Sequence, residues 1–501
     1  MNRKGILIVV SGFSGAGKGT LMKELLKRYD NYALSISATT RAPREGETDG
    51  KEYFFVSKEQ FEQMRDEQKL IEYAQYVNHY YGTPKEYVEQ KMAEGKDVIG
   101  VGKIYDIFEG QGVTETYLNQ GNESFEKSVN SEIYIDKTGL IKYTNRVLNT
   151  LQGYVCIRRP DEKIRKKVQE NWDSLAKPLD GLGIFEKIFT QIGAVTGDER
   201  VPLQKKAVIV MCADNGIVEE GISQSGQEVT YQVAESMGKR KSSVCLMAAQ
   251  ANAKVIPIDV GIAAKETPEG VWNKKVSRGT KNFLKQPAMT EKEALAAIEA
   301  GIDSVKKCKE DGMTLLATGE MGIGNTTTSS AVAAALLNCE TAAITGKGAG
   351  LSDAGLLHKI AVIDEARKKY QFDSKDVFRI LCSVGGLDIA GLCGVCIGGA
   401  VYGVPVVLDG VISAVAALVA ERLVPGVKDF LIASHKSREP AAALILQELG
   451  VHPVIDGSLA LGEGTGAVLM FGLLDTVHAV YGNRTTFSDI RVEAYKRFTD
   501  V

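Results

Sequence analysis

The sequence predicts an α/β protein in which a doubly wound, Rossmann-like parallel sheet with helical additions follows a shorter α/β segment that carries a phosphate loop. Apolar runs typical of buried strands alternate with Ala-rich helical patterns from about residue 161 onwards. These runs cover residues 207–212, 253–260, 314–317 and 404–408. Polar or glycine-rich turns follow them, as expected where ligands bind at the carboxyl ends of parallel strands.

Length and composition narrow the function classes. A chain of 501 residues with 44% hydrophobic and 25% charged residues is typical of a globular protein with about three domains. The formal net charge of -3, with no basic half, argues against nucleic-acid or membrane-surface binding. No segment reaches the roughly 18 uninterrupted apolar residues that a membrane span needs. The eight cysteines do not form a secreted disulfide framework, so we expect a cytoplasmic protein.

The first predicted element is a buried strand over residues 5–10, followed by a glycine loop and a helix. Such a loop presents backbone N–H groups to phosphates at a helix N-terminus, and its lysine contacts the outer phosphates. The hydroxyl residue comes one position later than usual, after a glycine. The candidate phosphate-binding residues are Gly12, Gly15, Gly17, Lys18, Gly19 and Thr20.

The next segment combines arginines, tyrosines and a carboxylate in a pattern suited to a nucleoside monophosphate. Residues 37–55 read SATTRAPREGETDGKEYFF, and IEY and YGTP follow at 71–73 and 81–84. On these motifs residues 1–99 resemble guanylate kinase. The resemblance implies that Arg41, Arg44, Tyr53 and Tyr81 hold the GMP phosphate, and that Ser37, Glu72 and Thr83 contact the guanine. Forked guanidinium groups suit a phosphate, and a carboxylate accepts from the guanine amino edge.

The guanylate kinase pattern stops after Ile99. The acidic strand end, the arginine-bearing lid and the adenine-contacting part of that family do not follow. Lid arginines stabilise the charge on the transferred phosphoryl group. We therefore expect a truncated P-loop kinase fragment at residues 1–99 that does not turn over by itself, with ATP and Mg²⁺ as cofactors only if the fragment is functional.

Residues 100–160 are predicted to be an irregular junction of short fragments. Residues 100–114 resemble an internal piece of phosphopentomutase, and residues 125–160 resemble the opening of an ATPase-like family. Each resemblance ends inside an element and lacks the composition of a linker. We interpret the chain as a chimeric reading frame, natural or assembled artificially. A single product amplified from source DNA across residues 99 and 160 would count against an assembly artefact.

Two glycine-rich segments mark the candidate site of the C-terminal domain. Glu463 lies in the sequence LGEGTGA of residues 461–467, where the backbone can approach a ligand closely. The turn alone is compatible with a general base or with a solvated turn residue. Residues 320–328, EMGIGNTTT, precede a helical pattern and suit either a bound phosphate or a structural N-cap.

Several motifs stand in a fixed order between residues 162 and 480. They are QEVT at 227–230, GT at 279–280, PAMT at 287–290, EMGIGN at 320–325, GKGAGLSDAG at 346–355 and VGG at 384–386. This set resembles nicotinate-nucleotide:dimethylbenzimidazole phosphoribosyltransferase, and residues 161–501 would form that domain. The resemblance implies transfer of the phosphoribosyl group of nicotinate mononucleotide to 5,6-dimethylbenzimidazole, which gives α-ribazole 5′-phosphate and nicotinate in cobalamin lower-ligand synthesis. It also implies a homodimer.

The resemblance also implies residue roles. Glu463 matches the general base that takes the benzimidazole proton, and Gln227 lies in the segment that lines the base pocket. The residues that match positions around the ribose phosphate are Glu320, Gly322, Lys359, Asp409 and Ser437. Asn215 and Lys347 stand where the family commonly has histidine and arginine.

We expect no metal ligand and no cofactor for this transfer. Two alternatives stay open for the whole chain. One is a bifunctional protein that also phosphorylates GMP with ATP. The other is a non-catalytic GMP-binding sensor fused to the transferase.

Overall fold

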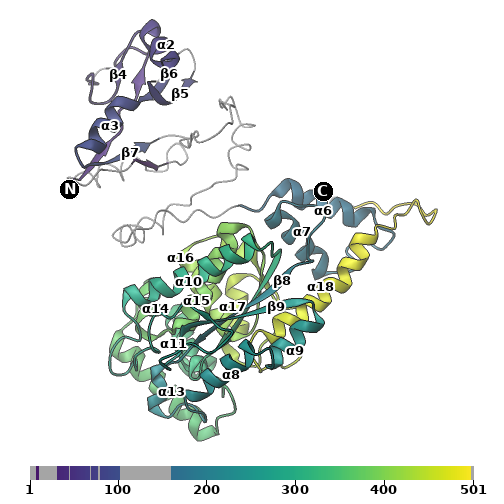
Figure 1. Ribbon diagram of the computed structural model, residues 1–501. Helices are drawn as coiled ribbons and strands as arrows, with labels where there is room; N and C mark the ends of the chain where they lie inside the picture. Colours follow the sequence, from purple (N-terminus) through teal and green to yellow (C-terminus); the bar gives the residue numbers. More distant parts are fainter. Residues whose placement is uncertain are drawn as a thin grey trace. The chain divides into compact units, whose positions relative to one another are not determined.

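The computed structural model describes residues 7–10, 31–44, 46–67, 69–76, 79–101 and 159–497 (Figure 1). These residues fall into two compact units, one on each side of the gap after residue 101. The phosphate-loop candidates from Gly12 to Thr20 lie outside the described residues. The predicted junction of residues 100–160 does too, apart from two residues at each end, and with it the phosphopentomutase-like and ATPase-like stretches. The domain boundaries stay predictions.

The described part of the N-terminal unit contains two small sheets. The first is parallel, with its strands in the order β1 (Leu7–Val10), β7 (Asp97–Val101), β2 (Tyr32–Leu34). The second is mixed, in the order β4 (Phe54–Phe55), β3 (Ala38–Thr39), β6 (His79–Pro84), β5 (Leu70–Tyr76). The helices among the described residues of this unit are α2 (Lys58–Asp66) and α3 (Lys85–Ala93). The parallel strands β2 and β7, with α2 and α3 between them in the chain, fit the predicted α/β fragment.

A six-stranded parallel sheet forms the centre of the C-terminal unit. In spatial order its strands are β10 (Trp272–Asn273), β9 (Ala253–Gly261), β8 (Lys206–Ala213), β11 (Leu315–Met321), β12 (Val406–Leu408) and β13 (Leu431–Ala433). The chain runs outward from β8 to β10 and then returns to place β11 on the other side of β8. The predicted doubly wound, Rossmann-like sheet is confirmed, with its topological switch point between β8 and β11.

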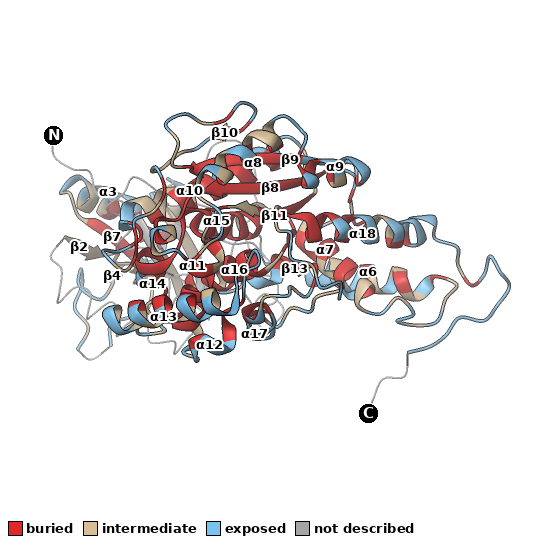
Figure 2. Cartoon of the chain, turned by 90° about the horizontal axis from the view of Figure 1, so that it is seen from below, coloured by how far each residue is buried: buried red, intermediate tan, exposed pale blue. Residues whose placement is uncertain are grey.

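Helices cover both faces of this sheet (Figures 1 and 2). All eight residues of β8 are buried, and alternate side chains enter two separate hydrophobic cores. A continuous apolar strand of this kind is typical of a parallel sheet covered on both sides. The first core contains side chains from α10 (Glu291–Glu310), α11 (Asn325–Leu337), α12 (Thr341–Ile344), α13 (Asp353–Tyr370), α14 (Val377–Val384), α15 (Leu387–Tyr402), α16 (Val411–Leu423) and α17 (Pro440–Leu449). The second contains side chains from α6 (Glu162–Ser174), α7 (Ile184–Thr196), α8 (Glu228–Gly238), α9 (Ser243–Gln250) and α18 (Thr465–Asn483).

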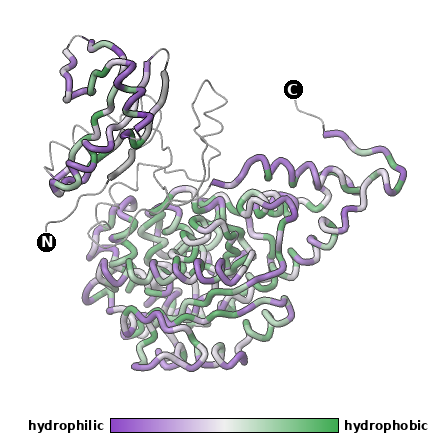
Figure 3. The backbone as a smooth tube through the Cα atoms, turned by 45° about the horizontal axis from the view of Figure 1, so that its top comes forward, coloured by the Kyte–Doolittle hydropathy of each residue, from purple (hydrophilic) through white to green (hydrophobic). Residues whose placement is uncertain are grey.

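One helix in the described part of the chain, α18, is long and apolar enough to cross a membrane by length and composition. Half of its apolar stretch is buried within the unit. It packs with α6 and α7, where the rings of Trp172, Phe189 and Tyr481 contact one another. Figure 3 shows hydrophobic stretches gathered inside this unit and hydrophilic ones along its outside. Packing in the second core therefore explains the apolar composition of the buried half of α18.

Candidate active site

The carboxyl ends of four parallel strands bring the predicted site residues to one edge of the sheet. Asn215 follows β8, Glu320 lies near the end of β11, Asp409 follows β12, and His435 follows β13. Because these strands are parallel neighbours, their carboxyl ends meet at the same edge, beside the switch point where a ligand is expected. The sequence-predicted candidates Glu320 and Asp409 are therefore placed close together.

Glu463 lies in a turn directly before α18 in which three successive residues have positive φ. The φ angles are 81° at Gly462, 61° at Glu463 and 92° at Gly464. A glutamate in this region costs roughly 1–3 kcal/mol, so the surroundings must hold it there. Both glycines are required by close packing: an added Cβ would lie 2.7 Å from Glu320 Oε1 at Gly462 and 2.6 Å from Val208 Cγ1 at Gly464.

The Glu463 carboxylate lies near the N-terminus of α9, and one of its oxygens has no partner within the described structure. The backbone N–H of Val244, in the first turn of α9, faces this carboxylate and lowers its pKa. Its Oε2 atom is buried and has no hydrogen-bond partner among the described residues. Burial raises the pKa of Glu463, and the charge of Asp409 raises it further, against the lowering effect of the Val244 N–H. A carboxylate oxygen in this state is suited to accept a proton.

Asp409 is a buried carboxylate that binds the first turn of α18. Its Oδ2 accepts from the N–H of Gly464 at 3.2 Å, and its Oδ1 accepts from Gly466 at 2.8 Å and Ala467 at 3.1 Å. Its own N–H donates to Thr318 Oγ1 at 3.1 Å. Burial raises the pKa of Asp409, although these N–H groups and His435 oppose the shift.

Glu320 belongs to a second group of carboxylates. The Asn325 amide donates to Asp388 Oδ2 at 3.2 Å and also to the Glu320 carboxylate. Burial, and next the charge of Asp388, raise the pKa of Glu320 to about 8. Burial likewise raises the pKa of Asp388 to about 6. A Cβ at Gly322 would lie 2.4 Å from Ala213 O and 2.8 Å from Asp388 Oδ2, so this position requires glycine.

Lys359 on α13 is fully buried beside the start of α11. Its Nζ donates to Thr326 Oγ1 at 2.9 Å and to Gly346 O at 3.1 Å. Burial lowers its pKa to about 8, against the opposing charge of Glu439. Glu439 is connected to the rest of the group because its N–H donates to Ser437 Oγ at 3.3 Å. The first turn of α11, this lysine and these hydroxyls form a polar cradle at a helix N-terminus.

Gln227 and Asn215 are connected at the end of β8. Gln227 Nε2 donates to Asn215 O at 3.1 Å, and Asn215 Nδ2 donates to Ile323 O at 3.3 Å. Asn215 Oδ1 is buried and has no partner in the part of the chain described. Asp388 and the Val244 N–H escaped the sequence-based reasoning, and Asn325 entered it only as part of the motif at residues 320–325. An acidic residue inside the apolar run of residues 387–400 was the one signal that pointed to Asp388.

Three of the predicted nucleotide contacts in the N-terminal unit lie together. The Arg41 guanidinium lies 5.0 Å from the centre of the Tyr53 ring, and the Tyr53 and Tyr81 rings are 6.1 Å apart. Arg41 forms a two-bond ion pair with Glu47, at 2.7 and 2.6 Å. The remaining candidates lie on or near the same sheet: Arg44 in the loop after β3, Ser37 just before β3, and Thr83 in β6; Glu72 lies in β5, and its side chain is outside the described part.

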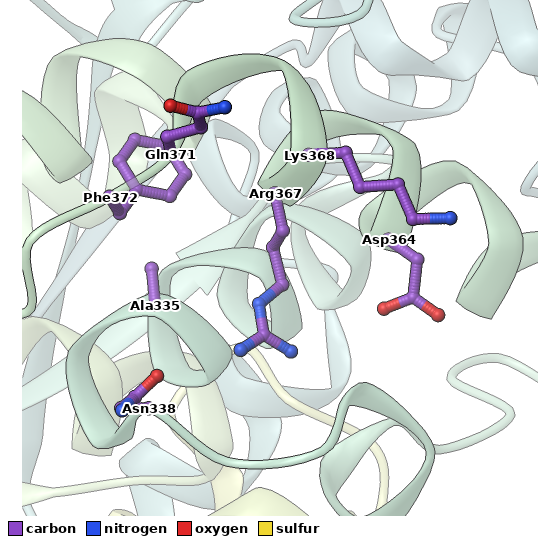
Figure 4. A pocket seen from close by; sticks show the side chains of 7 residues that line it. All are labelled: Ala335, Asn338, Asp364, Arg367, Lys368, Gln371 and Phe372. Atoms are coloured by element: carbon purple, nitrogen blue, oxygen red, sulfur yellow. The ribbon is translucent and has the colours of Figure 1, made fainter.

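A surface hollow of about 440 Å³ lies elsewhere on the C-terminal unit (Figure 4). Asn338, Arg367 and Phe372 are among its lining residues. Asn338 caps the C-terminal end of the 13-residue helix α11, whereas Thr326 and Lys359 lie at its N-terminal end. At 1.5 Å per residue the two ends are roughly 20 Å apart, so the hollow is separate from the candidate site.

Comparisons with known proteins match both units. A family model described as phosphoribosyltransferase matches residues 157–492, and one described as guanylate kinase matches residues 4–107. The nicotinate-nucleotide--dimethylbenzimidazole phosphoribosyltransferase of Clostridium acetobutylicum is 43% identical over 336 residues, which cover 67% of this chain and 96% of that protein. Its counterpart of the same name from Acetivibrio thermocellus is 44% identical and is covered to 94%. The crystal structure of CobT from Thermus thermophilus superposes with a TM-score of 0.63 at 35% identity, over 66% of this chain and 99% of that one.

Proposed function

The chain belongs to the phosphoribosyltransferase family whose model spans residues 157–492, and from this premise we propose that it transfers the phosphoribosyl group of nicotinate mononucleotide to 5,6-dimethylbenzimidazole. The products are α-ribazole 5′-phosphate, a precursor of the cobalamin lower-ligand nucleotide, and nicotinate. The observation that carries the proposal is Glu463, whose buried Oε2 lacks a partner in the described structure. It stands in a positive-φ turn that packs on Val208 of β8 and Gly319 of β11, the two strands on either side of the switch point.

Glu463 is the general base of the proposed reaction. Its Oε2 accepts the N–H proton of the benzimidazole while the other ring nitrogen forms a bond to C1′ of the ribose. The bond from C1′ to the nicotinate nitrogen breaks on the opposite face, and its electron pair neutralises the pyridinium. Attack opposite the leaving group converts the β-riboside into the α-riboside. Because nicotinate leaves from a cationic state, it needs no proton, and one carboxylate base is sufficient.

The polar cradle around Lys359 is the proposed site of the substrate phosphate. The Thr326 hydroxyl, 2.9 Å from Lys359 Nζ, lies in the first turn of α11, where backbone dipoles favour an anion. Lys359 forms no ion pair within 4.0 Å among the described residues, and its Nζ donates to Thr326 Oγ1 and Gly346 O, so a phosphate can supply a close counter-charge in addition to the more distant Glu439. Ser437 is connected to this group through Glu439.

Glu320 is the proposed contact for the ribose. A pKa of about 8 keeps its carboxyl group protonated near neutral pH, so it can donate a hydrogen bond to a sugar hydroxyl. Gly322 allows β11 and its turn to pack closely on Ala213 O and Asp388, which fixes the backbone next to Glu320. Gln227, which is anchored on Asn215 O, orients the wall nearest the incoming base.

The proposal includes a homodimer in the cytoplasm. Four apolar side chains of α9 and α18 are exposed, and a second copy would cover them. They are Leu246, Leu469, Leu473 and Val480. The cysteines in the described residues are free thiols, as expected in a reducing compartment. Light scattering at several protein concentrations measures the dimer directly, and a monomer at micromolar concentration would contradict it.

The N-terminal unit supports a second candidate function, GMP binding. The observation that favours it is the grouping of Arg41, Tyr53 and Tyr81. Calorimetric titration with GMP distinguishes the two alternatives for the full chain. Binding without GMP-dependent ADP formation indicates a sensor, whereas ADP formation indicates a bifunctional enzyme. An absence of binding removes both.

The proposed transferase activity is tested on the purified full-length chain. We expect nicotinate release from nicotinate mononucleotide that depends on dimethylbenzimidazole, with α-ribazole 5′-phosphate detected by mass spectrometry. Nicotinate release that is independent of the base would indicate hydrolysis. No release at all would contradict the proposal.

A further inference from the structure

The carboxylate of Asp409 is fully engaged with the chain segment that follows Glu463. The residue is 6% exposed, and both of its oxygens accept backbone N–H groups of residues 464–467 at 2.8–3.2 Å. These N–H groups belong to the start of α18 and have no partner within the helix, so Asp409 takes the place of an N-terminal capping residue. Gly464 itself makes no side-chain cap.

Neighbouring strands hold Asp409 in turn. Its N–H donates to Thr318 Oγ1 of β11, and that hydroxyl donates to Val407 O of β12 at 3.3 Å. The His435 ring packs directly on the backbone of Gly466, where an added Cβ would lie 2.1 Å from Nδ1. Ser434 Oγ lies 2.9 Å from the same Nδ1. Three strand ends therefore converge on the first turn of α18.

We propose that Asp409 is a positioning residue for Glu463: it holds residues 464–467 so that the preceding positive-φ turn presents the Glu463 carboxylate, with the α9 N-terminus against it and Oε2 left free. This inference rests on the proposed function, in which Glu463 is the general base. It differs from a role in substrate binding because both oxygens of Asp409 are occupied by protein N–H groups.

Asp409 acts on Glu463 through its charge as well as by holding the turn in place. Titratable groups that face the turn come from three strands: Glu320 of β11, Asp409 after β12 and His435 after β13. The N–H of Val244 faces it from α9. Asp409 raises the pKa of Glu463, so removing its negative charge lowers that pKa. The acid limb of the rate profile then moves to lower pH.

The test compares Asp409→Asn with Glu421→Gln in the full-length chain. Glu421 is a matched control because it is a half-buried carboxylate near the end of α16. It accepts hydrogen bonds from the backbone N–H groups of Gly426 and Lys428, which follow that helix. Asparagine keeps the shape and one acceptor oxygen of Asp409. We expect Asp409→Asn to lower kcat about 10- to 100-fold, since a misplacement of about 1 Å costs on the order of 100-fold. The KM for nicotinate mononucleotide should stay within about threefold.

Thr318→Val is the second variant, and it loosens Asp409 without removing the charge. It should lower kcat in the same direction while leaving the acid limb in place. A raised KM with unchanged kcat in Asp409→Asn would make Asp409 a substrate contact and overturn the inference. So would kinetics and a pH profile that match Glu421→Gln. Wild-type turnover reports on the proposed function and the variants report on Asp409, so the two failures are distinguishable.

Discussion

Replacing Gly319 by alanine would displace the turn that carries Glu463 without touching any side chain of the site. Gly319 lies in β11, and a Cβ added there would be 2.5 Å from Glu463 O, 2.8 Å from its carbonyl carbon and 3.0 Å from Gly464 N. An ordinary van der Waals contact begins at about 3.4 Å, so the turn must move by about 0.9 Å. All three obstructing atoms belong to the backbone and cannot rotate away.

Two consequences follow from that displacement. Overpacking of this kind costs about 1–3 kcal/mol of unfolding free energy. A shift of about 1 Å at the base lowers kcat on the order of 100-fold, while the KM for nicotinate mononucleotide changes less, because the phosphate contacts Lys359 and Thr326 are on other elements and only the ribose contact Glu320 lies beside the turn. Steady-state kinetics and urea denaturation measure the two effects separately.

The matched control is Gly472→Ala on α18. A Cβ at Gly472 would have no neighbour within 4 Å, so the substitution should leave kcat unchanged and stabilise the helix by up to about 1 kcal/mol. A Gly319→Ala protein with wild-type kcat would refute the reasoning, because it would show that the position of the turn does not control turnover.

Two further predictions concern buried charges at the site. Lys359→Met should raise the KM for nicotinate mononucleotide by about 10- to 100-fold, the loss expected for a charged hydrogen bond of about 1.5–3 kcal/mol. It should also remove the increase in stability between pH 8 and pH 10.5, where the folded protein binds fewer protons than the unfolded chain because burial lowers the pKa of Lys359 from 10.5 to about 8. The effect of Glu320 on stability has the opposite sign. Its pKa of about 8 lies above the ordinary 4.5, so between pH 4.5 and 8 the folded state binds more protons than the unfolded chain, and stability falls as the pH rises through this range. Glu320→Gln should flatten this decline in urea denaturation at pH 5, 6.5 and 8, and an unchanged slope would contradict the assignment.

The central sheet could be predicted well from the sequence because its strands are continuous apolar runs. The predicted strands at 207–212 and 253–260 fall within β8 and β9, and those at 314–317 and 404–408 overlap β11 and β12. The outer strands β10 and β13 have two and three residues and escaped prediction, whereas β12, also of three residues, was found because it lies in the longer apolar run of residues 404–408. Runs this short carry no periodicity to distinguish a strand from a loop.

The site was predictable where a side chain acts within a local motif, and not where a distant backbone acts. Glu463 stands out because glycines flank it. The Val244 N–H that lowers its pKa lies more than 200 residues earlier in the chain, and a backbone N–H leaves no trace in residue type. For the same reason, the sequence could not show that Asp409 holds the turn of Glu463. The three partners of Asp409 are the backbone N–H groups of Gly464, Gly466 and Ala467, and the side chains of these residues do not reveal the contact.

The most direct measurement of the central claim is turnover by Glu463→Gln beside binding of nicotinate mononucleotide. Glutamine keeps the size of the side chain and the acceptor that faces Val244, but it cannot take a proton. We expect the Kd for nicotinate mononucleotide to stay within about threefold while turnover with dimethylbenzimidazole falls about 100- to 10,000-fold, the usual contribution of a general base. Near-wild-type turnover with intact binding would contradict the assignment of Glu463 as the base.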